Sequence, residues 1–128
     1  MIVHGSCECG AVAFDLHGPL RDVVVCHCLQ CRKTSGHYWA ATSVPTPQLN
    51  LRKSESLIWY RSSDVARRGF CSGCGSSLFY ELDGEGRTSV STGTLDGETG
   101  LSTTKHIFVK DKGDYYDIAC QAALIARY

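Results

Sequence analysis

The chain has 128 residues, a length typical of one domain, and its 43% hydrophobic and 20% charged residues suffice to build a sizeable core. Thirteen basic residues balance thirteen acidic ones, so no overall positive field attracts nucleic acid or an anionic membrane surface. The N-terminus lacks a secretory signal, and no stretch reaches the ~20 apolar residues of a membrane span. We therefore expect one cytoplasmic domain over residues 1–128 that binds neither nucleic acid nor membrane.

The sequence predicts mainly short strands. Runs of β-branched and aromatic residues alternate with turn signals such as Gly18-Pro19 and Asp83-Gly84, a pattern typical of an antiparallel β domain. Helix is scarce, and residues 118–127 fit either a helical turn or a strand. The expected strands span residues 11–16, 23–25, 38–44, 57–61, 78–82, 88–91 and 107–110.

Eight cysteines are the unusual feature of the composition. They make up about 6% of the chain, below the share typical of small disulfide-stapled secreted proteins, and no secretory signal accompanies them. Seven of them fall in three tight groups, which favours metal binding over disulfides. The groups are Cys7 and Cys9; Cys26, Cys28 and Cys31; and Cys71 and Cys74, with Cys120 alone.

Two of these groups together predict a closed structural zinc site. A C-x-x-C turn places two thiolates on one ion, and Gly73 and Gly75 let the backbone around Cys71 and Cys74 curl around the metal. Zinc needs four ligands at tetrahedral corners, so a second pair must come from elsewhere. The other glycine-flanked pair, Cys7 and Cys9, completes a four-cysteine site.

The remaining trio points to a different kind of site. Cys26, Cys28 and Cys31 supply three thiolates from six consecutive residues, and no obvious fourth cysteine stands nearby. Three protein ligands with an open position are the arrangement of catalytic zinc, whereas structural sites are closed by four. The trio is therefore the candidate catalytic centre.

Several alternatives stay open at this point. The eight cysteines could form a disulfide framework, or the trio could hold an iron–sulfur cluster with Cys120 as fourth ligand. Both metal sites could also be purely structural, with His27, His37 or Cys120 closing the second. Cys120 by itself is more typical of a buried core thiol.

Thiolate-rich zinc sites carry net negative charge, so cations are expected beside them. Arg32 and Lys33 follow the trio, and Arg67 and Arg68 precede the C-x-x-C pair. They either offset thiolate charge or hold the carboxylates of an anionic thiol substrate. His27, between two expected ligands, points outward either as a proton carrier or as a solvated, inert side chain.

Three segments carry a specific family pattern: GSCECGAVAF at residues 5–14, CHCLQCRKTSG at 26–36 and RGFCSGCGSSL at 68–78. Weaker matches are GTLD at 93–96 and HIFV at 106–109. In this order they resemble the family of glutathione-dependent formaldehyde-activating enzymes, which also includes centromere protein V. The resemblance spans nearly the whole chain.

The resemblance implies a β-tent fold, in which antiparallel sheets lean together around cysteine-ligated zinc. It also implies a carbon–sulfur lyase activity, best known as the condensation of formaldehyde with glutathione to S-hydroxymethylglutathione. By position, Cys7, Cys9, Cys71 and Cys74 resemble the family's structural zinc ligands, and Cys26, Cys28 and Cys31 its catalytic ones.

Residues and resemblance together predict a two-zinc lyase that acts on a small thiol adduct such as one of glutathione. Arg32, Lys33 and Arg68 are the candidate substrate-binding residues. The alternative from another class is a non-catalytic zinc-binding module that binds a protein. An open position on the second zinc favours the enzyme, and a fourth protein ligand favours the module.

Overall fold

The computed structural model describes residues 1–119 and 123–128. Its helices are α1 (Leu29–Ser35) and three 3-10 turns, η1 (Thr46–Gln48), η2 (Thr92–Thr94) and η3 (Val109–Asp111). Its strands are β1 (Ile2–Ser6), β2 (Ala13–His17), β3 (Val23–Cys26), β4 (Trp39–Pro45), β5 (Leu49–Lys53), β6 (Leu57–Arg61), β7 (Ala66–Cys71), β8 (Ser77–Leu82), β9 (Arg87–Ser91), β10 (Thr103–Ile107) and β11 (Ala123–Leu124).

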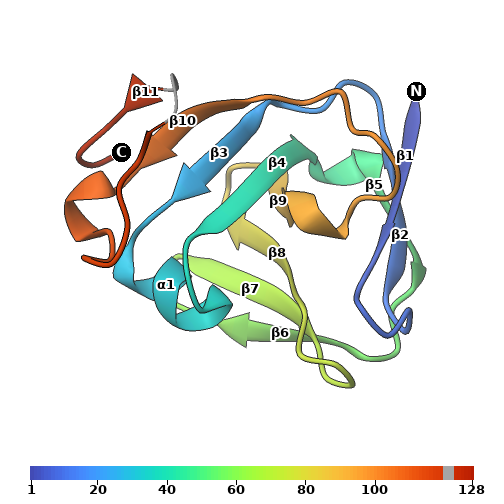
Figure 1. The fold of residues 1–128 in the computed structure, drawn as a ribbon. Helices are drawn as coiled ribbons and strands as arrows, with labels where there is room; N and C mark the ends of the chain where they lie inside the picture. The colour runs from blue at the N-terminus through green and yellow to red at the C-terminus, as the bar shows by residue number, and fades with distance from the viewer. Residues whose placement is uncertain (120–122) are drawn as a thin grey trace.

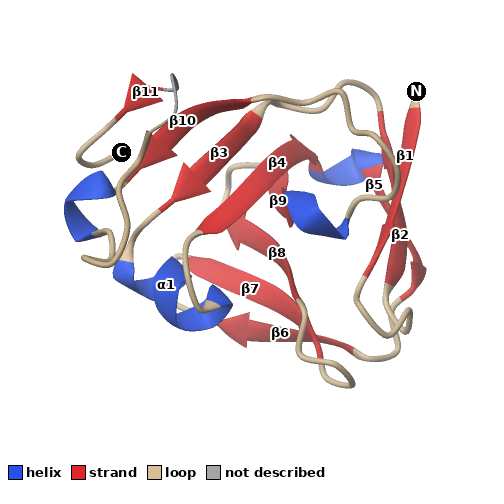
Figure 2. Cartoon of the chain, in the orientation of Figure 1, coloured by secondary structure: helices blue, strands red, loops and turns tan. Residues whose placement is uncertain are grey.

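The strands form two sheets, which confirms the mainly β fold (Figure 2). The small sheet has the order β1-β2-β5, and the large one the order β11-β10-β3-β4-β9-β8-β7-β6. All pairings are antiparallel except those of β10, which runs parallel to β3 and β11. The large sheet twists so that β6 and β7 run at a large angle to β3 and β4, with α1 lying between the two halves (Figure 1).

The main core fills the space between the two sheets. Phe14 and Leu16 point inward from β2 and pack against Val44, Phe79 and Val90 of the large sheet. The rings of Phe14 and Phe79 meet edge to face at 5.1 Å between centroids, a favourable aromatic geometry. Cys7 and Cys71 are buried in the same cluster, so one cysteine group is built into the core.

The close approach of β1 to β2 depends on Gly5. A Cβ at this position would lie 2.6 Å from the Phe14 ring and 2.9 Å from the carbonyl oxygen of Thr94. We expect Gly5→Ala to lower the free energy of unfolding by about 1–3 kcal/mol, because the overpacked ring and backbone must shift. Urea unfolding measures the change.

The matched control for this substitution is Gly93→Ala. A Cβ at Gly93 meets no atom within 4 Å, and its backbone is not left-handed. Equal stability losses in the two variants would show that the steric contact at Gly5 is unimportant.

The sequence located most strands, within one or two residues at their ends. The strand expected at 107–110 is wrong: β10 ends at Ile107, and the left-handed backbone of Phe108 (φ 55°) turns the chain into η3. Three strands, β1, β5 and β7, and helix α1 were not predicted. In the C-terminal stretch the described residues include the short strand β11. No helix in the described part of the chain is long and apolar enough to cross a membrane.

Candidate metal centres

The first cysteine group joins the β1–β2 turn to the end of β7 and the turn after it. The four Sγ atoms of Cys7, Cys9, Cys71 and Cys74 all lie within 4.8 Å of one another. The Cys7–Cys9 and Cys9–Cys71 sulfur distances are 3.6 and 3.8 Å. A tetrahedral zinc with Zn–S bonds of ~2.3 Å requires sulfurs ~3.8 Å apart. The group can therefore hold one tetrahedral metal ion.

Hydrogen bonds lower the pKa of two thiols in this group, Cys71 and Cys74, whereas the hydrogen bond with Cys7 and burial raise the pKa of Cys9. The Ser76 hydroxyl lies 3.2 Å from the Cys74 sulfur and, with backbone N–H groups, lowers the pKa of that thiol to about 5. The Ser56 hydroxyl, 3.3 Å from the Cys71 sulfur, lowers the pKa of Cys71. The Val12 N–H donates to the Cys7 sulfur at 3.2 Å. These donors prepare the group for a cation.

The second group lies where β3 passes into α1. Cys26 is the last residue of β3, Cys28 is the N-cap of α1, and Cys31 lies in its first turn. Their three Sγ atoms lie within 4.8 Å of one another. The Cys28 sulfur accepts the Cys31 N–H at 3.3 Å, as an N-cap side chain does.

The three thiols oppose one another's ionisation, because thiolates this close together repel each other. Hydrogen bonds from the thiols of Cys26 and Cys31 lower the pKa of Cys28 to about 2. The hydrogen bonds with Cys28 and Cys31 raise the pKa of Cys26, and burial and the charge of Cys31 raise it further. A metal cation is what allows all three to ionise together. The chemistry of this donor set fits zinc.

Arg68 of β7 reaches the second group from across the sheet. Its Nη2 lies 3.4 Å from the Cys31 sulfur, and its Nε donates to the Gln30 side-chain oxygen at 2.7 Å. The guanidinium also lies over the rings of Tyr80 and Trp39, at 5.0 and 5.6 Å from their centroids. Arg68 is thus held beside the thiolates by aromatic faces and by Gln30.

The other predicted cations lie elsewhere. Arg32 donates to the carbonyl of Asp111 at 3.0 Å, which fastens η3 to α1, and Lys33 is exposed on α1. Arg67 pairs with Glu81 at 2.7 Å and lies over the Trp59 ring. Of the four cations predicted near the metal sites, all of them described in the structure, Arg68 is the one that contacts a cysteine sulfur.

The expectation that the His27 side chain points outward is wrong, because His27 is 0% exposed. The side chains of Cys26 and Cys28 point toward the sulfur of Cys31, whereas the side chain of His27 between them points into the protein interior. Its Nδ1 is hydrogen-bonded to the Tyr116 hydroxyl and its Nε2 to Nδ1 of His106 at 2.9 Å. Burial, with the nearby His106, lowers the pKa of His27 to about 4, so the imidazole is neutral.

The structure tests whether a histidine closes the second cysteine group and whether the cysteines form disulfides. Neither His27 nor His37 joins it in the described residues; the Nδ1 of His37 is hydrogen-bonded to the Tyr115 hydroxyl at 2.9 Å. The seven described cysteines carry no disulfide. Cys120, weighed above as a fourth ligand or a core thiol, lies outside the described residues.

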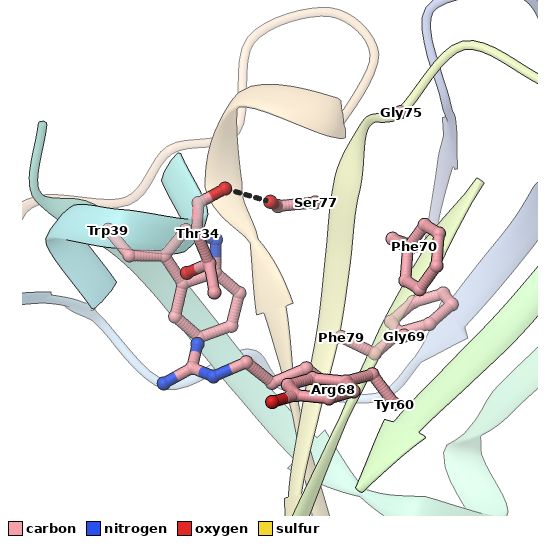
Figure 3. Close-up of a pocket in the computed structure, with 9 residues that line it drawn as sticks. All are labelled: Thr34, Trp39, Tyr60, Arg68, Gly69, Phe70, Gly75, Ser77 and Phe79. Carbon is pink, nitrogen blue, oxygen red and sulfur yellow. Dashed lines mark hydrogen bonds between the residues drawn. The ribbon is translucent and has the colours of Figure 1, made fainter. Parts of the chain in front are cut away.

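A pocket of about 350 Å³ adjoins the second group. Trp39 and Phe70 stand on opposite sides of it, and the Arg68 side chain extends toward the Trp39 ring (Figure 3). The Ser77 hydroxyl donates to the Thr34 carbonyl at 3.1 Å and ties α1 to β8 at its edge. Trp39 also packs against Cys31 and Arg68 contacts its sulfur, so pocket and cysteine group share two side chains.

The fold and the two cysteine groups define a β protein able to bind two metal ions. Residues 2–111 match the family described as glutathione-dependent formaldehyde-activating enzyme, and the chain belongs to this family. It is similar to an uncharacterized lyase of Schizosaccharomyces pombe, at 26% identity over 121 residues, which cover 94% of this chain and 88% of the relative.

The fold is also found among solved structures. A crystal structure of a Rhodobacter sphaeroides protein matches with a TM-score of 0.65 and 24% identity, over 76% of this chain and 91% of that one. At this identity the match shows the fold alone.

Proposed function

We propose that the chain is a zinc-dependent carbon–sulfur lyase that acts on a small thiol adduct, with glutathione as the thiol suggested by the family description. The name of the Schizosaccharomyces pombe relative, a lyase, agrees with this class. The observation that carries the proposal is the three-cysteine group: it offers three sulfurs in a mutual arrangement that fits one ion, beside a pocket.

The two cysteine groups have different roles, one structural and one catalytic. Cys7, Cys9, Cys71 and Cys74 hold a structural zinc, because four sulfurs close its coordination and two of them, those of Cys7 and Cys71, are buried in the main core. Cys26, Cys28 and Cys31 hold the catalytic zinc and leave a position open. Zinc bound there supplies Lewis acidity, which lowers the pKa of a substrate thiol and keeps it as thiolate at neutral pH.

The reaction needs little else from the protein than orientation. In the forming direction, the thiol sulfur bonds to the carbonyl carbon and the thiol proton ends on the carbonyl oxygen; the reverse breaks the same bond. Arg68 lies beside the Cys31 sulfur and holds a carboxylate or the negative charge of the thiolates. Arg32 and Lys33, on α1, are left as outer contacts for an anionic substrate.

Zinc content before and after dialysis against glutathione tests the proposal. We expect two zinc ions per chain in protein purified without chelator, falling toward one with an unchanged circular dichroism spectrum, because glutathione reaches the three-cysteine site. Two ions that both resist glutathione would mean two closed sites. That result would replace the enzyme with the protein-binding module.

A further inference from the structure

The pocket beside the three-cysteine group is lined largely by aromatic residues. Four aromatic side chains border it, from β4, β6, β7 and β8: Trp39, Tyr60, Phe70 and Phe79. Gly69 also borders the pocket, and the Cβ that it lacks would come within 3.1–3.2 Å of Phe79, Leu57 and Trp59, which lie in or against the main core. Phe79 is 1% exposed and packs in the main core, so the aromatic rings that face a ligand are those of Trp39, Tyr60 and Phe70.

The charges of the lining do not match those of glutathione. Arg68 is the single charged side chain among the described residues that border the pocket. Part of its donor set is already used, by the Gln30 oxygen and the Cys31 sulfur. Glutathione carries two carboxylates and an ammonium group, which need more than one guanidinium to be matched. A flat apolar group suits this lining better.

The position of the pocket relative to the cysteines indicates which part of a thiol adduct it binds. Trp39 and Arg68 border both the pocket and the three-cysteine group, so the two sites are neighbours that share these side chains. A ligand whose sulfur is at the cysteines is then placed to extend a carbon substituent toward the pocket. The volume of about 350 Å³ lies within the range of small-molecule sites, ~300–1,000 Å³. It exceeds what formaldehyde requires.

We infer that the pocket binds an apolar, aromatic-sized carbon substituent of the thiol adduct. The substrate class is then the adduct of a thiol with a larger aldehyde, R–S–CH(OH)–R′, in which R′ occupies the pocket. In its cleavage the carbon–sulfur bond breaks, the hydroxyl proton leaves as the carbonyl forms, and the sulfur departs as thiolate, which later takes a proton. No oxidant or reductant is needed. This inference rests on the proposed function and deepens it.

The test compares two inert thioethers, S-benzylglutathione and S-methylglutathione, by isothermal titration against the zinc-loaded protein. We expect the benzyl compound to bind about tenfold more tightly, since its ring is removed from water between aromatic side chains. Tyr60→Ala and Phe70→Ala should each reduce this ratio toward one and leave the affinity for the methyl compound unchanged. Tyr60 is 57% exposed on an edge strand, so its loss tests the pocket without threatening the fold.

The matched control is Tyr115→Ala, which removes a similarly exposed tyrosine that does not border the pocket. It should preserve the benzyl preference. Equal binding of both thioethers, or a preference lost in Tyr115→Ala and kept in Tyr60→Ala, overturns the inference while the proposed function stands. Absence of binding by both thioethers overturns the proposed thiol adduct itself, and the inference with it.

Discussion

Cys71→Ser is expected to yield a chain that does not fold. Cys71 is 0% exposed in the main core, and its sulfur joins the end of β7 to the β1–β2 turn. Structural zinc contributes apparent free energies of about 10–16 kcal/mol in small domains. The net stability of a domain is about 5–15 kcal/mol, so loss of this ion removes all or nearly all of it. Far-ultraviolet circular dichroism and zinc content measure the outcome.

Ser72→Ala is the matched control for this variant. Ser72 is the next residue, is exposed, and offers no sulfur to the group. It should keep the native spectrum and both zinc ions. A Cys71→Ser protein with the native spectrum and a cooperative unfolding transition would show that the four-cysteine group does not hold the fold together.

Cys28→Ser is expected to give a folded protein with one zinc ion and no thiol-dependent activity. The three-cysteine group packs in a smaller cluster with Trp39 and Ala41, apart from the main core. Serine is a preferred N-cap, so α1 keeps the cap that the Cys28 sulfur provides. The substitution therefore removes a metal ligand and little else. Zinc content, circular dichroism and turnover of a glutathione adduct together measure it.

Leu29→Ala provides the comparison at the neighbouring position. Leu29 begins α1 and is 57% exposed, so its truncation leaves the sulfurs in place. This variant should retain two zinc ions. If Cys28→Ser were as disordered as Cys71→Ser, the division into a structural and a catalytic centre would be wrong.

The division of seven cysteines into two groups was the part of the candidate site that could best be predicted from the sequence. Short loops such as C-x-x-C bring sulfurs together whatever the surrounding fold is, and a four-ligand ion then requires the two pairs to meet. The structure brings together Cys7, Cys9, Cys71 and Cys74, and separately Cys26, Cys28 and Cys31, in the expected sets. Arg68 was also singled out, from charge alone.

Some of the elements that were not predicted, β7 and α1, carry residues of the candidate site. Strand β7 carries Arg67 and Arg68, whose adjacent charges interrupt a hydrophobic strand pattern although both lie over aromatic rings in the sheet. Helix α1 is seven residues long and is capped by a cysteine, which is not among the usual capping residues. Strand β5 is largely exposed, so its hydrophobic alternation is weak.

The environment of His27 could not be predicted because its partners are distant in sequence. Tyr116 and His106 follow it by 89 and 79 residues. The parallel pairing of β3 with β10 brings His106 beside His27, and parallel pairing leaves no local turn signal; Tyr116 comes from the segment after η3. Alternation along the chain could have indicated that His27 turns away from Cys26 and Cys28, but not that its destination is buried.

Most of the lining of the aromatic pocket comes from the large sheet, and Thr34 of α1 and Gly75 of the turn after β7 complete it. Trp39 lies in β4 and Tyr60 in β6, and the strands β9, β8 and β7 lie between them. The distance between Trp39 and Tyr60 therefore depends on how these strands twist. A molecule held between these two residues acts as a brace across the sheet, and its presence should slow amide hydrogen exchange in β9, a strand that contributes no residue to the described lining.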